Sequence, residues 1–315
     1  MRLKSLTAFL FVAFAAVAFA QPAGYPSQPL TFIVPYGAGG MTDVSSRILA
    51  SAFEARLGQR VDVVNRPGAG GYLGLTEGLR EDADGHTLIA VTTDIFANTV
   101  LLERDFDLAS VGFLGSFMPQ ERVLFSPVDK PWSTYEEFVE YAKSNRVTFA
   151  DGGALWSGNV VKAMALEGGL DIAHIPFESG AAGSAALLGG HVDIGETGVG
   201  TAAWQAAKEG ELNILTILSD GTLAPFGFPE VENLEQKGFS NVVRMYYGIA
   251  VSGDVPEEIR SYLESVLQEI LADPEFVASL EALDLTPRFI PADDYAAIVT
   301  TVLVEAAGLR DFLAE

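Results

Sequence analysis

The residues best placed to do chemistry form a glycine-rich stretch near the start of the chain, Val34-Pro35-Tyr36-Gly37-Ala38-Gly39-Gly40-Met41-Thr42-Asp43. The apolar run at residues 30–34 is typical of a buried strand, and residues 44–53 carry apolar positions at helical spacing. The first turn of a helix has N–H groups without internal acceptors, and the helix dipole adds partial positive charge there. The stretch therefore predicts a corner that binds a small anion, carboxylates included. A plain strand-to-helix turn is the alternative.

Two nucleotide-binding motifs are excluded at this stretch. A phosphate-binding P-loop ends in Gly-Lys-Ser/Thr, and the stretch has no lysine. A dinucleotide fingerprint that starts at Gly37 needs glycine at position 42, where the chain has Thr42. We expect a small anion instead, with Thr42 or Asp43 capping the helix. The candidate ligand-binding residues here are Tyr36, Gly37, Ala38, Gly39, Gly40, Thr42 and Asp43.

Two further strands are followed by polar or glycine-rich loops. Residues 61–64 alternate as a strand does and lead into a second glycine loop that contains Gly70 and Gly71. A third apolar run, residues 86–91, ends at Thr93 and Asp94, which either face the ligand or cap the next helix. Because the carboxyl ends of parallel strands share one edge of a sheet, these loops are predicted to line one binding site.

The second half of the chain repeats the pattern. The segment 126–132 contains two prolines and is the candidate crossover into a second lobe, and the apolar run 242–251 is the candidate return. Between them, a polar loop after a predicted strand contributes Asp151, Gly152, Gly153 and Ser157, and a later strand end contributes Glu196 and Thr197. The C-terminal amphipathic helices are expected to serve packing alone.

The chain start and the composition limit the possible functions. Residues 1–20 combine a basic start, an apolar run and Ala18-Phe19-Ala20, which predicts a cleaved signal peptide, with an uncleaved anchor as the alternative. The sequence has no cysteine, so disulfides, thiolate sites and a lipidated cysteine are excluded. A net charge of −23 excludes nucleic acid as a partner, because phosphate contacts need clustered Lys and Arg. A soluble periplasmic protein of two lobes is expected.

Signatures of catalysis are scarce. The three histidines, His86, His174 and His191, share no metal-binding spacing, and no Gly-x-Ser-x-Gly elbow occurs. We therefore predict no catalytic residue, no metal site and no cofactor, and we expect that the protein is not an enzyme.

Six stretches then resemble the substrate-binding proteins of tripartite tricarboxylate transporters, the TctC or Bug family, over nearly the whole chain after residue 20. The matching stretches are residues 25–29, 34–43, 65–71, 84–88, 174–177 and 187–193. The resemblance implies an α/β fold of the periplasmic-binding-protein-like type II, with two lobes, two crossover strands and a ligand cleft between the lobes. The expected division is residues 21–126 plus 250–315 for the first lobe and 127–249 for the second.

The same resemblance implies that the loop matching Tyr36 to Asp43 holds the carboxylate of an organic acid, while the loop at Asp151 to Ser157 adds contacts from the other lobe. The chain departs from the family pattern at this second loop, where Leu155 and Trp156 would narrow the cleft or pack outward. It also has Glu196-Thr197 where many members carry Phe-Asp. Glu196 would repel a distal carboxylate and favour an amino group or hydroxyl, unless it points to solvent or caps a helix.

The expected function is that of a periplasmic, monomeric receptor that delivers a small carboxylate to a membrane permease. The alternative is a sensor that presents its bound carboxylate to a signalling receptor. A deaminase of similar two-lobed fold, which polymerises pyrroles, is excluded because it holds its cofactor through a cysteine.

Overall fold

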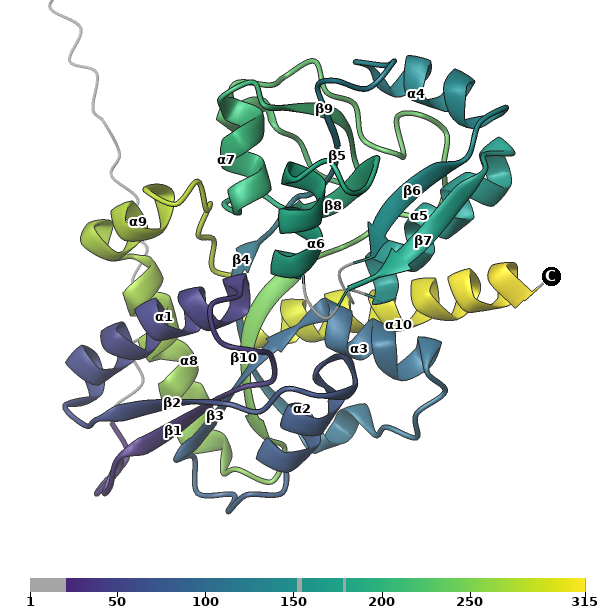
Figure 1. Cartoon of the computed structure of the whole chain (residues 1–315). Coiled ribbons are helices and arrows are strands. Elements are labelled where there is room, and N and C mark those ends of the chain that lie inside the picture. Colours follow the sequence, from purple (N-terminus) through teal and green to yellow (C-terminus); the bar gives the residue numbers. More distant parts are fainter. Residues whose placement is uncertain (1–20, 152–154, 178–179, 315) are drawn as a thin grey trace, which may run out of the picture.

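A computed structural model describes residues 21–314 apart from 152–154 and 178–179, and it contains two five-stranded sheets (Figure 1). The first has the order β2-β1-β3-β10-β4 and the second β7-β6-β8-β5-β9. The strands of the first sheet are β1 Leu30–Val34, β2 Val61–Asn65, β3 Thr87–Thr92, β4 Val111–Pro119 and β10 Tyr246–Ser252. Those of the second are β5 Arg122–Pro127, β6 Val147–Asp151, β7 Ile172–Pro176, β8 Ile194–Gly198 and β9 Leu212–Ile217.

Each sheet has a parallel part and one antiparallel strand that arrives from the other lobe. In the first sheet β1 pairs in parallel with β2 and β3, and β10 runs antiparallel to β3 and β4. In the second sheet β6 pairs in parallel with β7 and β8, and β5 runs antiparallel to β8 and β9. The two lobes are therefore built on one plan and joined by two chain crossings.

The first crossing lies earlier than the sequence suggested. Because β5 belongs to the second sheet, the chain changes lobe between Pro119 and Arg122 and not at the predicted segment 126–132. The prolines of that segment instead end β5 inside the second lobe, where Pro127 is the last strand residue. The crossing itself is marked only by Pro119 at the end of β4, a weaker signal than the two prolines of the segment 126–132.

Helices cover both sheets, and the longest of them touches both lobes. In Figure 1 helix α10 runs beneath the second lobe, and it packs against α3, β4 and α5. The helices of the first lobe are α1 Met41–Leu57, α2 Tyr72–Gly78, α3 Thr93–Leu101, α8 Glu257–Leu271, α9 Pro274–Glu281, which packs against α8, and α10 Ala292–Ala314. Those of the second lobe are α4 Tyr135–Ala142, α5 Leu155–Gly168, α6 Gly180–Leu188 and α7 Ala202–Lys208.

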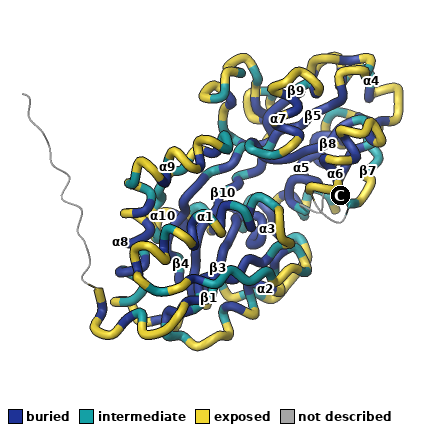
Figure 2. The backbone as a smooth tube through the Cα atoms, turned by 60° about the vertical axis from the view of Figure 1, so that its left-hand side comes forward, coloured by how far each residue is buried: buried dark blue, intermediate teal, exposed yellow. Residues whose placement is uncertain are grey.

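The inner strands are among the most deeply buried parts of the chain, while the edge strands β2 and β7 and the outer faces of the helices are more exposed (Figure 2). One hydrophobic cluster is continuous from Phe32 in the first sheet, through Phe117 and Tyr247 on the connecting strands, to Phe149 in the second sheet. The two lobes are thus packed against each other in this conformation. Among the described residues, no helix has both the length and the apolar character needed to span a membrane.

Candidate functional site

The glycine loop after β1 forms the predicted helix start, but without the predicted cap. Helix α1 begins at Met41, its N-cap is Gly40, and no side chain caps it. Asp43 instead reaches back one residue further, where its Oδ2 accepts the Gly39 N–H at 2.9 Å. The expectation that Thr42 or Asp43 caps the helix was wrong because the cap position falls on a glycine.

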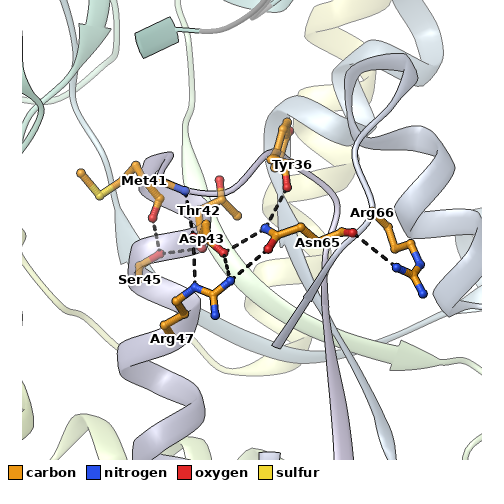
Figure 3. A network of polar contacts seen from close by, with 9 residues as sticks. Tyr36, Met41, Thr42, Asp43, Ser45, Arg47, Asn65 and Arg66 are labelled. Carbon is orange, nitrogen blue, oxygen red and sulfur yellow. Dashed lines mark hydrogen bonds and ion pairs between the residues drawn. The ribbon is translucent and has the colours of Figure 1, made fainter. Parts of the chain in front are cut away.

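Asp43 is the centre of a polar network that fixes the shape of the loop (Figure 3). Its carboxylate accepts hydrogen bonds from Arg47 Nε at 3.1 Å and Asn65 Nδ2 at 2.9 Å, and Asn65 also donates to the Tyr36 carbonyl at 3.0 Å. Burial opposes ionisation, but the hydrogen bonds from Arg47, Gly39 and Asn65 outweigh it and lower the pKa of Asp43. Asp43 is buried and engaged on both oxygens, so it positions the loop.

The backbone that this network holds is accessible. The first hydrogen bond of the helix runs from the Val44 N–H to the Gly40 carbonyl, so the three preceding helical N–H groups have no acceptor within the helix. Residues 37–39 are exposed, and a side chain built on Gly37 or Gly39 would meet no atom within 4 Å. The exposed loop residues therefore adjoin these three N–H groups, of Met41, Thr42 and Asp43, at the positive end of a 17-residue helix, where Thr42 and Asp43 are themselves buried.

This corner faces the junction of the lobes. The Thr42 side chain hydrogen-bonds to Tyr247 on β10. The Tyr247 hydroxyl donates to Gln120 Oε1 at 2.8 Å, and Gln120 Nε2 donates to the Val199 carbonyl in the second lobe at 3.1 Å. A hydrogen-bonded chain therefore leads from the helix start through both crossing segments to the other lobe.

The second glycine loop packs against helix α3 of the first lobe. Gly70 and Gly71 both have positive φ, and added side chains would meet Asn98 Nδ2 at 2.8 Å and Ile95 Cγ1 at 2.7 Å. The Gly70 carbonyl accepts a hydrogen bond from Asn98 Nδ2 at 3.2 Å. Both positions require glycine, because a larger residue would collide with α3.

Two predicted site residues follow β3: Thr93 contacts the returning chain, and Asp94 faces the other lobe. The Thr93 hydroxyl donates to the Arg244 carbonyl at 2.5 Å and accepts the Tyr246 N–H at 3.0 Å, so it ties α3 to the returning chain. Asp94, only 4% exposed, accepts Asn98 Nδ2 at 3.0 Å. It also accepts the backbone N–H of Trp156, in the first turn of α5.

Asp94 therefore bridges the two lobes, and it binds its proton more tightly than an ordinary aspartate does. Burial raises its pKa to about 6, against the attraction of Arg122 and with the repulsion of Glu196. Its Oδ1 has no hydrogen-bond partner among the described residues, and the same holds for Asn98 Oδ1 and Ser157 Oγ.

Glu196 forms a buried ion pair, so the alternative that it points to solvent is wrong. Its side chain is 2% exposed, and its Oε2 accepts Arg122 Nε at 2.9 Å. The register pairs Leu124 with Glu196, and Arg122 lies two residues earlier on the same face of the sheet. Burial opposes the charge of Arg122, but the attraction of Glu196 outweighs it and raises the pKa of the guanidinium.

The remaining predicted site residues of the second lobe that the structure describes lie on different elements and do not share one face. Asp151 ends β6, Gly152 and Gly153 lie outside the described residues, and Ser157 is fully buried in α5. Thr197 is paired with Val123, on the face opposite Glu196. The ring of Trp156 is buried and lines a pocket of 380 Å³ between α5 and α10, so it does not narrow the cleft.

Sequence reasoning missed four residues of this site. Arg122 and Tyr247 lie in the middle of strands, and Gln120 lies in the first crossing, where no local pattern distinguishes them. Asn98 did carry a signal, because it follows Asp94 by four residues on one helix and therefore shares its face. No group of three or more His, Cys, Asp or Glu side chains suited to a metal occurs within the described chain.

A family model, curated relatives and solved structures match most of the chain. The model of the family TctC, described as tripartite tricarboxylate transporter family receptor, matches residues 45–307. A UPF0065 protein encoded in the gbd 5′ region of Cupriavidus necator is 28% identical over 282 residues, which cover 88% of this chain and 85% of the relative.

Solved structures share the two-lobed fold. A TctC solute-binding protein from Polaromonas is 26% identical with a TM-score of 0.73, and the match covers 91% of this chain and 99% of that one. MatC from Rhodopseudomonas palustris with bound malate is 22% identical with a TM-score of 0.77, over 91% of this chain and 100% of its own.

Proposed function

The chain belongs to the tripartite tricarboxylate transporter receptor family, and from that premise we propose that it captures a small carboxylate between its lobes and delivers it to a membrane permease. The family assignment and the two-lobed α/β fold predicted from the sequence motifs are confirmed. Members of this family are periplasmic solute-binding proteins. The observation that carries the proposal is the accessible N-terminus of α1, whose loop is held by Asp43 and faces the second lobe.

The chemistry of capture follows from that corner. A carboxylate placed there accepts the N–H groups at the start of α1, and the helix dipole favours its negative charge. The network of Asp43, Arg47 and Asn65 keeps the donors in place before the ligand arrives, so little ordering cost falls on binding. Closure of the second lobe then removes the ligand from water, and the closed form is the state that a permease recognises.

The same proposal includes location and partners. Residues 1–20 direct the chain to the periplasm, where the receptor acts as a monomer with permease subunits as its partners. Neither nucleic acid nor a cofactor takes part, and the bound solute leaves chemically unchanged.

Thermal unfolding of the protein against a panel of small organic acids tests the proposal. A ligand held at about 100 times its dissociation constant stabilises the folded state by about 2.7 kcal/mol, which raises the unfolding temperature measurably. We expect a rise with one class of carboxylate and none with matched amides or alcohols that lack the carboxylate. A panel without any carboxylate-dependent rise would contradict the proposal.

A further inference from the structure

The polar groups between the lobes limit what can bind at the far end of the ligand. Helix α5 of the second lobe begins at this junction, and a helix start of 14 residues would ordinarily attract a second anion. Here the carboxylate of Asp94, from the first lobe, already accepts the Trp156 N–H in the first turn of that helix. The protein thus supplies its own anion at the second helix start.

Among the residues that the structure describes, the junction offers no unpaired cation to a second ligand carboxylate. The guanidinium of Arg122 is buried against Glu196, with Nε 2.9 Å from its Oε2. Together with Asp94, these described residues make a cluster of two carboxylates and one guanidinium. Asp94 is attracted by Arg122 and repelled by Glu196. Buried like charges repel strongly, because the interior screens them poorly. A dicarboxylate bound at α1 would bring its second charge to a site that is already negative.

The same junction has acceptors that lack donors. Asp94 Oδ1 and Asn98 Oδ1 are buried without a hydrogen-bond partner among the described residues, as is Ser157 Oγ. The orientation of the Asn98 amide is set by its contacts, since Nδ2 donates both to Asp94 Oδ2 at 3.0 Å and to the Gly70 carbonyl at 3.2 Å. Its Oδ1 can therefore only accept. Buried polar atoms are rarely left unpaired, and leaving them so is costly.

We infer that the cleft selects a small zwitterionic amino acid, with its carboxylate on the N-terminus of α1 and its ammonium group on Asp94 Oδ1 and Asn98 Oδ1. This inference rests on the proposed function and names the substrate class of the same site. An ammonium group has three donors and no acceptor, which matches the unpaired oxygens, and its charge compensates the extra carboxylate. A hydroxyl has one donor and no charge, so it satisfies the junction incompletely.

Affinities for two matched series of compounds test the inference by titration calorimetry. One series is alanine, lactate and methylmalonate, and the other is 4-aminobutyrate, 4-hydroxybutyrate and glutarate, so that only the second functional group changes. In whichever series fits the cleft, we expect the amino member to bind at least about tenfold more tightly than the hydroxy member, and the dicarboxylate most weakly.

The variant Asp94→Asn checks that the preference arises at this residue. It should lower the affinity for the amino member by about ten- to a hundredfold and leave the hydroxy member nearly unchanged. Asp82→Asn removes an exposed carboxylate from the same lobe and is the matched control, with no expected change. Tighter binding of a hydroxy acid or a dicarboxylate by the unaltered protein would overturn the inference and leave the proposed function standing. No binding of any carboxylate would overturn both.

Discussion

Asp94→Asn should make the ligand-free protein more stable at neutral pH, although it removes a site residue. Burial raises the pKa of Asp94 from 3.8 to about 6, so its ionised form is less favourable in the folded than in the unfolded chain. At about 1.4 kcal/mol for each tenfold change in proton affinity, this amounts to about 3 kcal/mol against the folded state above pH 6. Asparagine has nearly the same shape, can still accept the Trp156 N–H, and carries no charge.

The sign of the pH dependence follows from the direction of the shift. Below about pH 4 Asp94 is protonated in both states, and it costs nothing. Between about pH 4 and 6 the unfolded chain loses the proton first, so the stability of the unaltered protein falls as pH rises, and above pH 6 the cost is constant. The charged groups that act on Asp94 are Arg122, which lowers the cost, and Glu196, which raises it, and the hydrogen bonds from Asn98 and the Trp156 N–H also lower it.

Unfolding temperatures of the unaltered protein, Asp94→Asn and the control Asp82→Asn, measured from pH 4 to 8, check this reasoning. The advantage of Asp94→Asn should be near zero at pH 4 and grow to about 3 kcal/mol by pH 8, at about 2–4 °C for each kcal/mol. A variant that is less stable at pH 8, or an advantage independent of pH, would refute the claim that ionised Asp94 destabilises the folded state.

Two other substitutions separate binding from folding. Gly40→Leu should weaken carboxylate binding more than about tenfold in calorimetry. The unfolding temperature should not fall, because Gly40 has φ −76° and an added Cβ would meet only the Gly37 carbonyl oxygen at 3.6 Å. Unchanged affinity would remove this loop from the site. Glu196→Gln should destabilise the protein by about 3–5 kcal/mol, because the buried Arg122 loses the only carboxylate to which it is hydrogen-bonded among the described residues. The double variant Arg122→Gln/Glu196→Gln should recover part of the loss, and a single variant of full stability would show that the ion pair contributes little to stability.

The helices and strands were predictable where sequence periodicity is strong, and the lobe boundary was not. The C-terminal amphipathic helices and the strand before each glycine loop are where their patterns place them. The first crossing was assigned to the proline segment 126–132, because prolines usually break an element. In the structure those prolines lie at and just after the end of β5, and the crossing at residues 120–121 comes directly after a single proline, Pro119, which ends β4.

The structure of the first glycine loop, a strand followed by a helix start, was predictable because its pattern lies in consecutive residues. The junction of the lobes was not, because its side chains meet only through the fold. Arg122 and Glu196 are 74 positions apart, so the sequence suggested Glu196 as a candidate specificity residue without showing its partner. The ion pair neutralises that charge, and the uncompensated carboxylate is that of Asp94, which the sequence allowed as a simple helix cap.

A crystal structure of the protein with its tightest-binding carboxylate would test the central claim most directly. The account predicts carboxylate oxygens about 2.7–3.2 Å from backbone nitrogens at the start of α1, in a cleft closed by the second lobe. A carboxylate bound elsewhere, such as the pocket between α5 and α10, with the N-terminus of α1 facing only solvent, would contradict it.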